Sequence, residues 1–157
     1  MRNAFNMKHS NLTGEIIGIC MRVHDTLGPG LLESVYEEAI CYELKKEGLS
    51  FKRQYDIPVK YGDIELGIGF RADLIVEDKV IVELKSVEEV SPVHSKTLLT
   101  YMRLTGIEVG LIINFNTLLL KNGITRLIDD KSKFAKSRGE NKGMSHGGTE
   151  NAEGKAK

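Results

Sequence analysis

The chain has 157 residues, of which 41% are hydrophobic, so it can bury the core of one domain. Residues 1–130 contain 15 basic and 19 acidic residues and residues 131–157 contain 7 basic and 3 acidic ones, which gives a net charge of zero. This balance excludes binding of nucleic acid through bulk positive charge. With no apolar leader at the N-terminus and no apolar run of membrane-spanning length, we expect a cytoplasmic protein without membrane contact.

Two amphipathic helices are predicted in the first third of the chain. Thr13 has the properties of an N-cap for a helix over 14–27, where apolar residues recur at helical spacing. The segment 28–30, Gly-Pro-Gly, ends this helix. A second helix is expected over 31–47, with Gly48 at its C-terminal cap.

The periodicity then changes to that of β-strands. Strands are predicted over 51–60, 64–76 and 80–86, because these segments are rich in β-branched and aromatic residues. Short polar segments at 61–63 and 77–79 are expected to form the two turns between them. The three segments therefore predict an antiparallel meander.

A third helix is predicted from Ser91, followed by proline at the first helical position, to Thr105. An apolar strand is expected over 109–114. The segments 118–120 and 125–128 are predicted to pair as a hairpin turned at Asn-Gly.

This order of elements predicts an α+β fold with a mixed sheet flanked by helices. The domain is expected to span 12–130 and to follow a flexible N-terminus at 1–11. Residues 131–157 are basic and poor in apolar side chains, so we expect a disordered tail.

Asp73 and Glu83 lie on the two predicted strands that flank the turn at 77–79. If Val76 and Val80 close a three-residue loop, facing positions sum to 156 and the two carboxylates share one face of the sheet. Facing like charges destabilise a sheet by up to about 1 kcal/mol and raise the pKa of at least one carboxyl group. A divalent cation bound between the carboxylates of Asp73 and Glu83 would relieve this repulsion. A two-residue turn would instead place the carboxylates on opposite faces.

Lys85 lies two residues after Glu83 and is expected on the same face, where its ammonium group can reach a phosphate. The same register places Arg71 opposite Lys85, which would add positive charge to the site. The alternative interpretation is an exposed sheet face with a solvated cross-strand Asp–Lys pair.

A second motif precedes this pair. Residues 30–36 read Gly-Leu-Leu-Glu-Ser-Val-Tyr, and Asp73, Glu83 and Lys85 follow with D-x(9)-E-x-K spacing. The segments 101–106 and 110–116 complete a colinear similarity over positions 12–128. On these residues the chain resembles the GxxExxY proteins, a branch of the PD-(D/E)XK nuclease-like superfamily.

The resemblance implies a restriction-endonuclease-like αβββαβ core. It also implies a Mg²⁺ or Mn²⁺ site formed by Asp73, Glu83 and the backbone carbonyl of Leu84, with Glu33 binding directly or through water. Lys85 would orient or help deprotonate the attacking water. The implied activity is hydrolysis of phosphodiester bonds in nucleic acid, DNA foremost. Glu33 has an alternative explanation, because an acid in the first turn of a helix is favoured by the helix dipole.

One position departs from the pattern of many relatives, which carry Gln four residues before a Tyr on the helix after the E-x-K strand. Here Thr97 precedes Tyr101, and its short hydroxyl cannot reach as far as an amide. A weakened or inactive nuclease fold that binds nucleic acid or protein is therefore the alternative function, unless His94 or Lys96 has taken over the contact. We expect Tyr36 and Tyr101 to be core aromatics with hydroxyl groups near the site.

Several properties remain open at the level of sequence. A metal-dependent hydrolase of small phosphate compounds is a third, weaker interpretation. The pattern does not distinguish DNA from RNA, single from double strands, or endonuclease from exonuclease action. It also leaves the oligomeric state open, with a homodimer among the options.

Overall fold

The computed structural model describes residues 8–130, so the tail predicted at 131–157 and residues 1–7 of the predicted N-terminal segment lie outside the described residues. A five-stranded mixed sheet with strand order β1-β2-β3-β4-β5 forms its centre. β3 and β4 are parallel, and the other neighbouring pairs are antiparallel. The elements are α1 (Ser10–Leu27), α2 (Glu33–Lys46), β1 (Phe51–Tyr61), β2 (Ile64–Val76), β3 (Val80–Lys85), α3 (Pro92–Thr105), β4 (Val109–Asn114), the 3₁₀ helix η2 (Leu120–Gly123) and β5 (Ile124–Ile128).

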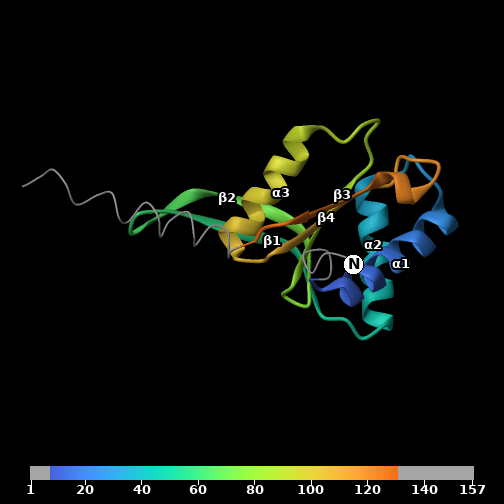
Figure 1. Cartoon of the computed structure of the whole chain (residues 1–157), viewed down its shortest axis with the longest axis horizontal. Coiled ribbons are helices and arrows are strands. Elements are labelled where there is room, and N and C mark those ends of the chain that lie inside the picture. Colours follow the sequence, from blue (N-terminus) through green and yellow to red (C-terminus); the bar gives the residue numbers. More distant parts are fainter. Residues whose placement is uncertain (1–7, 131–157) are drawn as a thin grey trace, which may run out of the picture.

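Helices cover both faces of the sheet (Figure 1). Val80, Val82 and Leu84 of β3 belong to the core cluster formed with α1 and α2, whereas Ile81 belongs to a second cluster formed with α3. This alternation is the two-residue period of a strand that is buried on both faces. Glu83 follows Ile81 in the series that points toward α3. The β1–β2 hairpin continues past the helices as an arm (Figure 1).

The α+β prediction is confirmed, and α2-β1-β2-β3-α3-β4 has the predicted αβββαβ order. One helix boundary was wrong, because α1 begins at Ser10 and includes the last residues of the segment predicted to be flexible. Thr13 lies inside the helix, where its hydroxyl donates to the Ser10 carbonyl oxygen at 3.1 Å and does not cap the N-terminus. Within residues 8–130, no helix has the length and apolarity required to cross a bilayer.

The predicted hairpin near the C-terminus was also wrong. The chain forms η2, and β5 pairs with β4 instead of with the segment 118–120. Gly123 explains the change, because a Cβ atom at this position would lie 2.3 Å from the carbonyl oxygen of Asn114. Glycine therefore lets the chain approach the end of β4 closely and then turn back along it.

Candidate active site at the separation of two strands

The turn between β2 and β3 determines where the two predicted carboxylates lie. Val76 pairs with Val80 and Ile75 with Ile81, so the predicted three-residue loop and its register are confirmed. Two loop residues have positive φ angles, 53° at Glu77 and 52° at Asp78. The loop therefore closes in the register on which the predicted site depends.

Backbone pairing between β2 and β3 ends at Leu74 and Val82, one position before the carboxylates. Beyond this point each strand is joined to the other through a carboxylate side chain. The Asp73 N–H donates to Glu83 Oε1 at 3.0 Å, and the Leu84 N–H donates to Asp73 Oδ2 at 2.8 Å. These reciprocal bonds fix both carboxylates at the same point between the strands. The sequence correctly predicted that Asp73 and Glu83 come together, but not that they bind the backbone there.

The predicted position of Arg71 opposite Lys85 was wrong, because the pairing between β2 and β3 ends before it reaches them. Arg71 pairs instead with Asp56 of β1, and its Nε donates to Asp56 Oδ1 at 2.9 Å. Both side chains of this ion pair are exposed. Arg71 is therefore engaged with β1 on the hairpin arm.

The site has an excess of buried negative charge. Burial is the main cause that raises the pKa of Glu83 to about 8, and the charge of Asp73 raises it further. Burial also raises the pKa of Asp73, while the Leu84 hydrogen bond and the charge of Lys85 lower it. The pair consequently retains a proton near neutral pH, and a cation in the place of that proton would relieve the repulsion.

The donor set fits a hard divalent ion that binds oxygen. Asp73 and Glu83 offer carboxylate oxygens, the ligand type that Mg²⁺ and Mn²⁺ prefer. Among residues 8–130, no three or more Asp, Glu, His or Cys side chains are grouped so that they could hold a metal ion. A cation held here would therefore use the two carboxylates and complete its shell with backbone carbonyl and water oxygens.

Glu33 and Glu37 both extend from α2, one helical turn apart. Glu33 Oε1 accepts a hydrogen bond of 3.2 Å from the Ser86 N–H, next to Lys85 at the end of β3. The α2 carboxylate whose charge acts on Asp73 is Glu37, which is only 6% exposed. Sequence reasoning missed Glu37, although it shares the buried side of α2 with Ile40.

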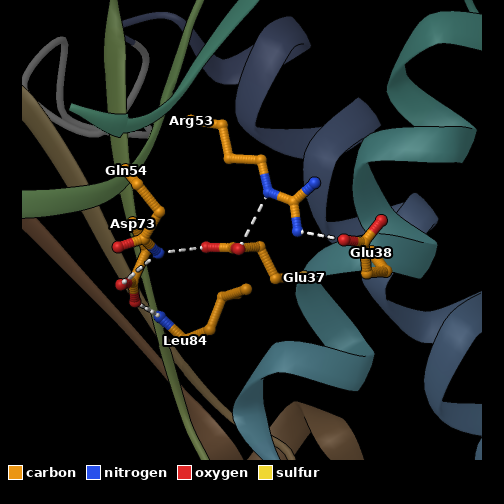
Figure 2. A network of polar contacts seen from close by, with 6 residues as sticks. All are labelled: Glu37, Glu38, Arg53, Gln54, Asp73 and Leu84. Atoms are coloured by element: carbon orange, nitrogen blue, oxygen red, sulfur yellow. Dashed lines mark hydrogen bonds and ion pairs between the residues drawn. The ribbon is translucent and has the colours of Figure 1, made fainter.

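Glu37 reaches Asp73 through Gln54 of β1 (Figure 2). The Gln54 amide donates to Glu37 Oε1 at 2.5 Å and to Asp73 Oδ1 at 3.4 Å. Arg53 holds the other side of this network, because its Nε donates to Glu37 Oε2 at 2.9 Å and its terminal nitrogen to Glu38 Oε1 at 2.6 Å. Gln54 is a second residue that sequence reasoning missed.

Two further residues lie beside the carboxylates. Lys85 is half-buried, and its charge lowers the pKa of both Asp73 and Glu83. Burial raises the pKa of Tyr101, and the charges of Glu83 and Asp73 raise it further, so the phenol lies near the pair. The ring of Phe70 contacts Tyr101, with 5.5 Å between the centroids.

Tyr36 and His94 stabilise the local fold. The Tyr36 hydroxyl donates to the Gly28 carbonyl at 2.6 Å and accepts from the Leu31 N–H at 3.0 Å, which fixes the turn before α2. His94 Nδ1 accepts from the Ser91 N–H at 3.1 Å at the start of α3. These contacts give both residues a structural role, and their role as substrate or supporting contacts stays a prediction.

Thr97 is half-buried on α3, one helical turn before Tyr101. Its role as a substrate or supporting contact stays a prediction. The same is true of metal binding by Glu33 and by the Leu84 carbonyl.

Comparison with known proteins gave a family match that spans the site. A family model described as the PD-(D/E)XK nuclease superfamily matches residues 10–127. A search of curated proteins gave no match. Among solved structures, the chain is similar to an alkaline exonuclease from Laribacter hongkongensis, with 17% identity, coverage of 83% of this chain and 89% of that chain, and a TM-score of 0.41. The family match runs from α1 into β5 and includes Asp73, Glu83 and Lys85, so the chain belongs to the PD-(D/E)XK nuclease superfamily.

Proposed function

We propose that this protein is a divalent-metal-dependent nuclease that hydrolyses phosphodiester bonds in DNA, and that it represents the GxxExxY branch of its superfamily. One observation carries the proposal: Asp73 and Glu83 meet where two strands separate, and both have a raised pKa beside Lys85. Superfamily membership supports nuclease activity, and the excess negative charge supports the need for a cation.

Asp73, Glu83 and the Leu84 carbonyl would hold Mg²⁺ or Mn²⁺, and Glu33, which accepts a hydrogen bond from the Ser86 N–H, would contribute through a bound water. A divalent ion held there would supply Lewis-acid stabilisation of charge on the scissile phosphate and would lower the pKa of a coordinated water. Lys85 holds the attacking water in line and donates to a phosphate oxygen. Tyr101 is only 9% exposed and lies beside the carboxylates, so its ring would limit the access of bulk water to them.

The substrate strand is proposed to lie along the hairpin arm. A hollow of about 830 Å³ lies there, and the ring of Phe70, which is 40% exposed, connects it to Tyr101 beside the carboxylates. Aromatic rings next to a phosphodiesterase site are suited to stack with unpaired bases. The residues that line the hollow include Tyr55, Ile57, Pro58, Leu66, Phe70 and Arg71.

Replacing Phe70 with Ala is expected to raise the KM for cleavage of single-stranded oligonucleotides about tenfold and to leave kcat within about threefold, because one stacked base contributes roughly 1–3 kcal/mol. Steady-state kinetics at several oligonucleotide lengths measures both constants. Tyr42→Ala is the matched control, since it removes an exposed ring from α2, outside the lining of the hollow. An unchanged KM for Phe70→Ala would contradict this path for the strand.

The proposed function is tested by metal-dependent cleavage. Protein treated with a chelator is expected to be inactive and to regain cleavage with Mg²⁺ or Mn²⁺, on single-stranded, duplex or branched DNA assayed beside RNA and mononucleotides. A cation at 100 times its Kd should also stabilise the fold by about 2.7 kcal/mol, which raises the thermal midpoint. Gel-based cleavage and differential scanning fluorimetry measure the two effects.

Other outcomes would favour the other functions. Binding of oligonucleotides without cleavage and without a thermal response to Mn²⁺ would support the binding module, the alternative that Thr97 motivates. Cleavage of mononucleotides alone would support a hydrolase of small phosphate compounds. Cleavage of RNA alone would replace DNA as the substrate.

Two secondary parts of the proposal concern location and electrostatics. Cys20 and Cys41 are buried free thiols, which is compatible with the reducing cytoplasm proposed for this protein.

The excess of basic residues in 131–157 would add a weak, salt-sensitive attraction to nucleic acid. Sedimentation at several salt concentrations, with and without DNA, would report this attraction and the oligomeric state together.

A further inference from the structure

Gln54 lies in an unusual backbone conformation opposite Asp73. The neighbouring pairs of β1 and β2 are Arg53 with Leu74 and Tyr55 with Ala72, and the ladder is interrupted between them. The φ angle of Gln54 is 48°, a left-handed value that is energetically unfavourable for a residue with a side chain. Glycine or asparagine would adopt this conformation at lower cost. The presence of glutamine therefore points to a requirement for its side chain.

The side chain of Gln54 connects two carboxylates through its one amide nitrogen. That nitrogen lies 2.5 Å from Glu37 Oε1 and 3.4 Å from Asp73 Oδ1 (Figure 2). Glu37 is a firm anchor, because it is 6% exposed and its second oxygen accepts from Arg53 Nε at 2.9 Å. The amide is thus fixed on the α2 side and presents its other hydrogen to Asp73.

A primary amide suits this position better than the other side chains of similar length. It offers two N–H donors to two acceptors and adds no charge. Lysine or arginine would cancel part of the negative charge that attracts a cation, and an apolar residue would leave Asp73 Oδ1 without this donor. Because the Leu84 N–H already holds Asp73 Oδ2, the two donors together fix the rotation of the Asp73 carboxylate.

We infer that Gln54 is a positioning residue for the active site: its amide, anchored by Glu37 and Arg53, orients the Asp73 carboxylate toward Glu83. The inference rests on the proposed function, since the orientation of Asp73 affects activity only where Asp73 holds the catalytic cation. Gln54 lies on β1 and its anchor Glu37 on α2, both outside the strands that carry the D-x(9)-E-x-K residues. Residues that orient metal ligands in this way typically change metal affinity by 10–100-fold when they are replaced.

The decisive variant is Gln54→Asn. Asparagine tolerates the left-handed backbone but is one methylene too short to connect Glu37 with Asp73. We expect a thermal midpoint close to that of the wild type, because the lower backbone cost of asparagine offsets the lost hydrogen bond to Glu37, together with Mn²⁺ affinity weakened about tenfold in calorimetric titration. A residue that served only the backbone would show no loss of affinity. Glu38→Gln is the control, because it changes only the outer, exposed end of the network.

A second measurement reads the orientation of Asp73 without metal. The backbone amide of Leu84 donates to Asp73 Oδ2, so its ¹H–¹⁵N signal is expected to move in metal-free Gln54→Asn and Gln54→Leu and to stay in place in Glu38→Gln. An unmoved Leu84 signal in both Gln54 variants would overturn the inference, even if Mn²⁺ binding were weaker. If the wild type bound no Mn²⁺, the proposed function would fail, and the Leu84 signal would still decide whether Gln54 positions Asp73.

Discussion

Asp73→Asn is expected to reduce metal-dependent cleavage by about a thousandfold, the upper range for loss of one group that stabilises charge in a transition state. The change removes one of the two carboxylates that would hold the cation and keeps the shape of the side chain. When both proteins are free of metal, the same variant should be more stable than the wild type above about pH 8, because only there are Asp73 and Glu83 both ionised and repel each other. Cleavage rates and thermal midpoints of the chelator-treated proteins measure the opposite effects.

The contacts of Asp73 determine which replacement is informative. Its Oδ2 accepts the Leu84 N–H, and an asparagine oxygen can accept the same bond. Asp73→Ala would leave this partly buried donor without a partner, at a cost of about 1–3 kcal/mol, so a loss of activity could reflect a damaged fold.

Asp78→Asn is the matched control for Asp73→Asn, since it makes the same chemical change in the exposed Asp78–Lys52 ion pair, outside the lining of the hollow. Its cleavage rate should stay close to that of the wild type. Full metal-dependent cleavage by Asp73→Asn, in a folded protein, would remove the basis of the proposed mechanism.

The register of the candidate site was predictable because it depends on local sequence. The turn 77–79 is short and polar, and the β-branched runs on each side leave few alternative pairings. Ser91 and Pro92 likewise define the start of α3, where the helix begins at the predicted residue. These signals lie within a few residues of the features that they specify.

The remaining parts of the site depend on contacts between distant segments. Gln54 reaches Asp73 only because β1 adopts a positive φ at this position, which no residue preference of glutamine predicts. Glu37 meets Arg53 because α2 packs beside β1, and a helical pattern alone does not identify the partner of a buried acid. The ladder between β2 and β3 ends before it reaches Arg71 and Lys85, because the two strands separate there. The residues of neither strand predict this separation.

The metal-free protein is expected to lose about 2 kcal/mol of unfolding free energy between pH 6 and pH 8.5. The sign follows from Glu83, whose pKa is raised from 4.5 to about 8, chiefly by burial and then by the charge of Asp73. The folded state therefore binds the proton more tightly than the unfolded chain does. This contribution is complete below pH 4.5 and is lost as the pH rises through about 8. Chemical denaturation across this pH range measures it.

Glu83→Gln should remove most of this pH dependence, because its neutral amide oxygen still accepts the Asp73 N–H and does not titrate. Glu65→Gln, on the exposed hairpin arm, is the control and should retain it. The charged and titratable groups around Glu83 are Asp73, Lys85 and Tyr101. A pH dependence that persisted undiminished in Glu83→Gln would assign the proton to another of these groups.

The same proton should control metal binding in the opposite direction. A cation that binds Asp73 and Glu83 must displace the shared proton, so Mn²⁺ affinity should rise about tenfold per pH unit below pH 8 and then level off. Cleavage at subsaturating metal should follow the same curve. Saturating Mn²⁺ should therefore offset the loss of stability at alkaline pH, because the divalent ion neutralises the negative charge that both carboxylates carry after deprotonation. Stability that falls with pH equally with and without Mn²⁺ would show that the cation binds elsewhere.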